Sequence, residues 1–158
     1  MEAREIRLPA FTVIGYQIEA NLDELEAGLG KQAYNLLISS KDEIPHKKNE
    51  NVILMQIYPM KPGFSPRVDR FTQIFGYETA STDDVPSGMI HHTVSEGKYV
   101  TYTHRGLESE LGKSYDYVYG KWMRETNNEP KGFDFEIWDQ RYQPDSPENE
   151  IDLFVAIR

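Results

Sequence analysis

The sequence predicts an α+β domain built from two β-α-β-β modules. The modules join into one antiparallel sheet with two helices on one face, and a groove follows the pseudo-twofold axis between them. Three observations predict this fold: segments recur in order at near-constant spacing, each repeat holds one helical pattern among strand patterns, and 158 residues suit a single domain. Each module leaves an apolar sheet face that needs cover, and both helices can cover one joined sheet. We expect one domain over residues 1–158, with repeats at about 4–80 and 89–158 and a bridge at 78–97.

The repeat is visible in four pairs of short segments. The clearest pair shares the string Leu-Gly-Lys, which begins at Leu29 and again at Leu111. The other pairs share chemistry more than identity, and a similar length of chain separates the members of every pair. In chain order of their first members, the pairs are Phe11–Ile14 with Tyr99–Tyr102, Leu29–Tyr34 with Leu111–Asp116, Gln56–Tyr58 with Glu136–Trp138, and Phe71–Phe75 with Ile151–Val155.

Six segments rich in β-branched and aromatic residues predict strands, three in each half of the chain. Proline-rich turns at 58–63 and 143–147 separate the last two strands of each half, and a further turn is expected at 85–88 within the bridge. The predicted strands are Phe11–Gln17, Val52–Tyr58, Phe71–Tyr77, Tyr99–Thr103, Phe133–Trp138 and Ile151–Ile157.

One helix is predicted in each half, after its first strand. In the second half, apolar residues spaced by 4, 3 and 4 form one face: Leu111, Tyr115, Val118 and Trp122. The matching residues of the first half keep this phase with smaller side chains: Leu29, Ala33, Leu36 and Ser40. Gly28 and Gly30 are expected to weaken the start of the first helix, because glycine has low helix propensity.

Composition excludes several classes of function. Lys and Arg total 17 against 26 Asp and Glu, a net charge of −9, so direct nucleic-acid binding is not expected. The chain has no cysteine, which excludes disulfides, thiolate metal sites and cysteine nucleophiles. We expect no metal or cofactor, because no paired-histidine, Gly-x-Gly-x-x-Gly or Walker spacing occurs.

The N-terminus and the hydropathy pattern bear on location. The opening residues MEAREIRLPA lack the charged and apolar regions of a signal peptide. The stretches without a charged residue are short, as in Leu8–Ile18, whereas a membrane span needs about 20 residues. We therefore expect a cytoplasmic chain that does not enter the membrane.

Glu136 is the first candidate for chemistry. It lies in a strand whose alternation places Phe133, Phe135 and Ile137 on one face and Asp134, Glu136 and Trp138 on the other. If the Phe and Ile face meets the helices, Glu136 faces the groove. A carboxylate walled by aromatic rings is desolvated, which raises its pKa and strengthens its attraction for a cation. It could also act as a general base toward water. The alternative is an exposed glutamate on an ordinary polar sheet face.

Aromatic residues supply the other candidates. Trp138 shares the face of Glu136, and Trp122 ends the apolar stripe of the second helix, where core packing is the better interpretation. Flat aromatic faces suit planar or cationic ligands. The pseudo-symmetric counterparts of Trp122, Glu136 and Trp138 are Ser40, Gln56 and Tyr58, so the larger and charged groups belong to the second half. Four strand residues could line the groove or belong to the core: Tyr58, Phe75, Tyr102 and Phe154.

The ordered set of segments LPAFTVIG, YETASTDDVPSGM, EGKYVTYTHRG, FEIWDQ and ENEIDLFVAIR resembles the GyrI-like small-molecule-binding domain over about residues 4–157. This domain forms the effector-binding part of some AraC-type and MerR-type multidrug regulators. The resemblance implies a groove for lipophilic, often cationic or planar aromatic compounds, with an acid at its base that maps to Glu136. It also implies an aromatic residue at the position of Phe154.

Three functions follow from the resemblance, and we rank them in order. The first is a stand-alone domain that binds lipophilic small molecules, with Glu136, Trp138, Trp122, Tyr102, Phe154, Tyr58, Phe75 and Gln56 as ligand-binding residues. The second is a hydrolase of strained, cyclopropane-bearing natural products with Glu136 as the catalytic residue. The third is interaction with a protein partner, DNA gyrase or a separate regulator. No DNA-binding domain is expected, because the effector-like domain starts by residue 4.

Overall fold

The structure, a computed structural model, describes residues 2–158, and these residues form eight strands and two helical segments. The first helical segment contains α1 (Leu22–Glu24), a π-helical turn (Leu25–Leu29) and α2 (Gly30–Ser40), and a 3-10 turn (Lys41–Glu43) follows it. The second follows a 3-10 turn (Glu108–Glu110) and contains α3 (Leu111–Asp116), a π-helical turn (Tyr117–Trp122) and α4 (Met123–Thr126). The strands are β1 (Arg4–Leu8), β2 (Phe11–Ala20), β3 (Val52–Ile57), β4 (Phe71–Thr79), β5 (Ile90–Val94), β6 (Gly97–Arg105), β7 (Pro130–Trp138) and β8 (Glu150–Ile157).

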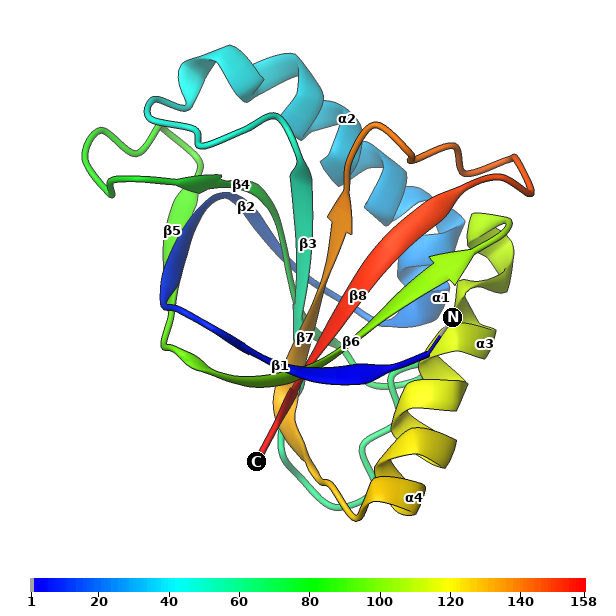
Figure 1. Ribbon diagram of the computed structural model, residues 1–158. Coiled ribbons are helices and arrows are strands. Elements are labelled where there is room, and N and C mark those ends of the chain that lie inside the picture. The colour runs from blue at the N-terminus through cyan, green and yellow to red at the C-terminus, as the bar shows by residue number, and fades with distance from the viewer. Residues whose placement is uncertain (1) are drawn as a thin grey trace.

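All eight strands belong to one curled antiparallel sheet in the order β1-β6-β8-β7-β3-β4-β2-β5. Both helical segments lie against the same face of this sheet, α2 over the first half of the chain and α3 and α4 over the second (Figure 1). The prediction of an α+β fold with a joined antiparallel sheet and two helices on one face is confirmed. No helix within residues 2–158 is long and apolar enough to cross a bilayer.

Two edge strands were missing from the predicted β-α-β-β modules. β1 precedes the first predicted strand, and β5 lies inside the expected bridge. β1 pairs with β6 of the second half and β5 pairs with β2 of the first half, so the two modules exchange their edge strands. Both strands are short and largely exposed, and their charged or histidine residues hide the apolar alternation that marks a half-buried strand.

The strand register defines the pseudo-twofold axis. Met55 of β3 pairs with Phe135 of β7, which is its own counterpart in the repeat, so the axis passes through this pair. The register also corrects the alignment of the first strands. Gly76 and Ala156 are counterparts in the repeat. Gly76 pairs with Gly15 and Ala156 pairs with Tyr99, so the counterpart of Tyr99 is Gly15 and not Phe11.

The two faces of the sheet carry separate cores. On β8, Leu153 packs in the cluster that includes α2, and Val155 packs against Val118 of the second helical segment. On β7, Phe135 belongs to a different cluster on the opposite face, inside the curl of the sheet. The condition stated for Glu136 was therefore wrong: the helices meet the Asp134, Glu136 and Trp138 face, because the curled sheet covers its own Phe and Ile face.

The first helical segment begins earlier than the sequence indicated. Asn21 caps it by accepting a hydrogen bond from the Glu24 backbone, and the Glu24 side chain accepts one from the Asn21 backbone. This capping box satisfies two backbone donors that would otherwise be unpaired. Gly28 does not mark the helix start. It lies inside the segment at φ 134°, where the helix kinks before α2.

Two glycines allow β2 and β4 to approach each other. Gly15 and Gly76 are paired across these strands, and a Cβ atom on Gly15 would lie 2.0 Å from the Phe75 carbonyl oxygen. Gly15→Ala is therefore expected to lower the free energy of unfolding by about 2 kcal/mol, measured by denaturant titration. Gly112→Ala is the control, because a Cβ there meets nothing within 4 Å and should cost no stability. Equal effects of the two substitutions would contradict this account.

Candidate functional site

Two buried carboxylates project from β7 toward the helices. Asp134 is fully buried and Glu136 is 2% exposed. Both belong to the strand beside the pseudo-twofold axis, where Asp134 pairs with Gln56 and Glu136 pairs with Leu54 of β3. They therefore lie at the seam between the two halves, under the second helical segment.

Asp134 receives three hydrogen bonds from neutral side chains. The Gln56 amide donates to its Oδ1 at 2.7 Å. The hydroxyls of Tyr58 and Tyr119 donate to its Oδ2 at 2.8 and 2.5 Å. Burial and the nearby carboxylate raise the pKa of Tyr58 and that of Tyr119 well above the ordinary value, so both keep their protons.

Glu136 is held by two donors, one on each oxygen. The Tyr115 hydroxyl donates to Oε2 at 2.5 Å, and the Trp138 indole N–H donates to Oε1 at 2.8 Å. The Gln56 amide also donates to the Tyr115 hydroxyl at 3.1 Å, which links Glu136 to the Asp134 site. The two carboxylates thus form one hydrogen-bonded cluster of Asp134, Glu136, Gln56, Tyr58, Tyr115, Tyr119 and Trp138. We call this set the carboxylate cluster.

The carboxylate cluster contains no cation. In the described chain, residues 2–158, every ion pair of a lysine or an arginine is made with an acid other than Asp134 or Glu136. Burial raises the pKa of Asp134 to about 6, although the bonds from Tyr119, Tyr58 and Gln56 oppose the shift. Burial likewise raises the pKa of Glu136 to about 7, against the bonds from Tyr115 and Trp138. An uncompensated buried charge is costly, so the cluster favours any species that brings a positive charge.

Aromatic rings wall this cluster on the side of α2. Trp138 stacks on Tyr142, with ring centroids 4.6 Å apart and an interplanar angle of 2°. Tyr34 of α2 contacts both rings, at 5.4 Å from Trp138 and 6.1 Å from Tyr142. Phe75 of β4 meets the Trp138 ring edge-on at 6.4 Å. The groove beside Glu136 is therefore filled by the protein's own side chains.

A cavity of about 400 Å³ lies on the outer side of this aromatic wall. It opens between α2 and the segment that follows β7. Its aromatic lining consists of Tyr34, Tyr77, Trp138 and Tyr142, and its charged lining consists of Lys41, Glu50 and Asp139. The Trp138 ring therefore borders the cavity, and its indole nitrogen contacts Glu136.

The structure brings together five of the eight residues predicted to bind a ligand. Glu136, Trp138, Gln56 and Tyr58 belong to the carboxylate cluster, and Phe75 contacts Trp138. The other three lie elsewhere. Trp122 packs in the core beneath the second helical segment, and Phe154 stacks on Phe135 on the opposite face of the sheet at 4.8 Å.

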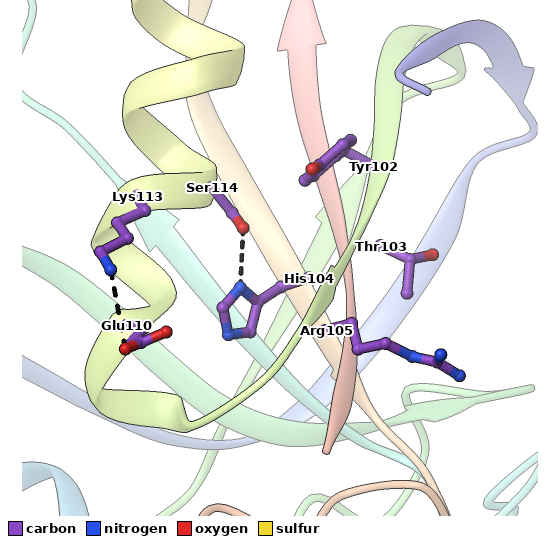
Figure 2. Close-up of a pocket in the computed structure, with 7 residues that line it drawn as sticks. All are labelled: Tyr102, Thr103, His104, Arg105, Glu110, Lys113 and Ser114. Carbon is purple, nitrogen blue, oxygen red and sulfur yellow. Dashed lines mark hydrogen bonds and ion pairs between the residues drawn. The ribbon is translucent and has the colours of Figure 1, made fainter. Parts of the chain in front are cut away.

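Tyr102 lines a separate cavity of about 360 Å³ between the end of β6 and α3 (Figure 2). In this cavity His104 and Ser114 lie between the strand and the helix. The His104 Nε2–H donates to the Leu107 carbonyl at 2.9 Å, so in the neutral ring Nδ1 accepts from the Ser114 hydroxyl at 2.7 Å. Both ring nitrogens thus hold the strand end to the start of α3.

Sequence reasoning missed several residues of the carboxylate cluster and its wall. Asp134 was placed on the face of Glu136 but was not selected, and Tyr115 was assigned only to an apolar helix face. Tyr119, Tyr34 and Tyr142 were not considered. One signal was available: in the helix alignment that matches the two Leu-Gly-Lys strings, Tyr115 and Tyr119 correspond to Ala33 and Leu37. The helix hydroxyls of the carboxylate cluster are therefore confined to the half that carries the acids.

The fold and the site define a small-molecule effector-binding domain of the kind found in transcription regulators. Residues 6–157 match the Cass2 family, described as integron-associated effector binding protein, and the chain belongs to this family. The resemblance to GyrI-like effector-binding domains is confirmed.

The chain is similar to a transcriptional regulator in sequence and to two solved structures in fold. The chain is 30% identical over 159 residues to the transcriptional regulator BrlR of Pseudomonas aeruginosa, covering 99% of this chain and 56% of the regulator. SAV2435 bound to tetraphenylphosphonium has the same fold, with a TM-score of 0.76, 14% identity, and coverage of 100% of this chain and 94% of that chain. EcmrR in its complex with DNA also shares it, with a TM-score of 0.71, 10% identity, and coverage of 99% and 57%.

Proposed function

We propose that this chain binds lipophilic aromatic cations at the seam between its two halves, with Asp134 and Glu136 supplying the counter-charge. The observation that carries the proposal is a pair of buried carboxylates whose hydrogen-bond partners are all neutral. A cationic ligand would provide the charge that the site lacks. Because the site is desolvated, the attraction would be much stronger than between the same charges in water.

The aromatic wall supports the same ligand class. The rings of Trp138, Tyr142 and Tyr34 offer flat π faces beside the carboxylates. A cation over such a face gains about 0.5–2 kcal/mol, more when it is desolvated. Both oxygens of Glu136 are held by hydrogen bonds, an arrangement that suits holding a charge better than activating a water molecule. The tetraphenylphosphonium complex of SAV2435, a protein of the same fold, identifies a suitable probe.

The test compares two ions of nearly the same shape and opposite charge. Calorimetric titration with tetraphenylphosphonium should give saturable binding, whereas tetraphenylborate should bind at least about 100-fold more weakly, a difference of about 2.7 kcal/mol. Equal binding of the two ions would indicate a purely hydrophobic groove and contradict the role of the acids. Absence of binding by this cation and by smaller aromatic cations would overturn the proposal.

A further inference from the structure

We infer that the cavity of about 400 Å³ outside the aromatic wall is an outer subsite for planar aromatic cations, and that Tyr142 is the lid over its inner surface. This inference rests on the proposed function, because it describes how a ligand reaches the carboxylate cluster. The cavity volume lies within the range of about 300–1,000 Å³ that is usual for small-molecule sites.

Trp138 separates the cavity from the acids. Its ring lines the cavity, while its indole N–H donates to Glu136 Oε1 at 2.8 Å. The indole therefore satisfies the carboxylate from the side on which a ligand would arrive. A cation that enters from the cavity meets the Trp138 ring first and Glu136 directly behind it.

Tyr142 occupies the position that a flat ligand ring would take. It lies parallel to Trp138 at 4.6 Å between ring centroids, the geometry of an offset-stacked aromatic pair. A planar ligand that stacks on this surface of Trp138 must first displace the Tyr142 ring. The displaced stack would be replaced by a similar one, with the positive charge of the ligand as the added attraction.

One hydrogen bond holds the Tyr142 side chain, and ion pairs fix the backbone beside it. The Tyr142 hydroxyl donates to Glu108 Oε2 at 2.7 Å. The neighbouring Arg141 is tied to Asp139 at 2.8 Å and to Asp152 at 2.7 Å. These ion pairs anchor the backbone beside Tyr142, so opening requires the Tyr142 ring to turn away while Arg141 stays in place.

The charged residues that line the cavity are Glu50, Asp139 and Lys41. Asp139 is already paired with Arg141 at 2.8 Å, so the aromatic lining, and not the charge of the rim, provides the attraction for a cation. One aromatic ring of the lining already accepts a positive charge, because the Lys47 ammonium lies 5.5 Å from the centroid of the Tyr77 ring.

Trp138 provides the reporter for the test. The chain has two tryptophans, so Trp122→Phe leaves Trp138 as the single indole. In this background, titration with 1-methylquinolinium, a planar cation that quenches tryptophan on contact, should quench the emission saturably. Adding Tyr142→Ala should raise the association rate constant measured by stopped flow about 5-fold or more, because the lid no longer has to open. Tyr142→Phe, which loses only the contact with Glu108, should give a smaller increase.

Tyr117→Ala is the matched control. This half-buried tyrosine packs against Tyr102 at 5.0 Å between ring centroids and a tilt of 45°, and it does not line the cavity, so its loss should leave the association rate unchanged. A slower association or weaker binding with Tyr142→Ala would make Tyr142 a wall of the site and overturn the lid. Quenching of Trp138 with an unchanged rate would also overturn it. Binding seen by calorimetry without quenching of Trp138 would overturn the outer subsite and leave the proposed function standing, whereas no binding of any aromatic cation would refute both.

Discussion

Replacing both acids, in the variant Asp134→Asn with Glu136→Gln, should weaken tetraphenylphosphonium binding at least about 100-fold, or about 2.7 kcal/mol. The substitutions keep the shape of each side chain and remove only its charge. At residue 136 the new carbonyl can accept from the Trp138 indole, and the new amide can donate to the Tyr115 hydroxyl oxygen. At residue 134 the carbonyl can accept from Tyr58 and Tyr119 once the Gln56 amide turns over.

The stability of the same variant should change in the opposite direction. Buried charges without a cation destabilise the folded chain, so their removal should raise the free energy of unfolding near about pH 8. A loss of binding together with increased stability would separate a ligand-binding role from a structural one. Glu125→Gln changes the net charge of the chain at an exposed helix position and serves as the control for long-range electrostatics. Unchanged affinity in the double variant would refute the role of the acids.

Stability should also depend on pH through Glu136, whose pKa rises from 4.5 to about 7 on folding because of burial. The folded carboxyl keeps its proton to a higher pH than the unfolded one. Its contribution to stability is therefore complete below 4.5 and is lost as the pH rises through about 7. The loss attributable to Glu136 is on the order of 3 kcal/mol.

The measurement is the difference in unfolding free energy between wild type and Glu136→Gln, because other titrating groups cancel in it. Relative to the variant, the wild type should be least stable at about pH 8 and should gain stability as the pH falls to about 4. Tetraphenylphosphonium affinity should change in the opposite sense and increase as the pH rises through about 7, as the carboxylate becomes charged. A pH-independent difference in stability would show that Glu136 is not desolvated.

Local sequence patterns were sufficient for the main elements of the fold. The apolar alternation of β7 and the spacing of Leu111, Tyr115 and Val118 require only neighbouring residues to be read. The edge strands β1 and β5 escaped because exposed strands carry weak alternation, and their exchange between halves depends on contacts far apart in the chain. The start of the first helix was misplaced because the Asn21 capping box was overlooked.

The sequence by itself determined that this protein is a duplicated α+β effector-binding domain with an acid and a tryptophan on one face of a strand near its seam. The tertiary structure alone decided which face of the sheet meets the helices, because both faces of β7 carry apolar residues. It also joined Asp134 to Glu136 through hydroxyls from the second helical segment, and it placed Tyr142 on Trp138. Those contacts depend on how the sheet curls and how the helix lies across it, and no local pattern of residues encodes either.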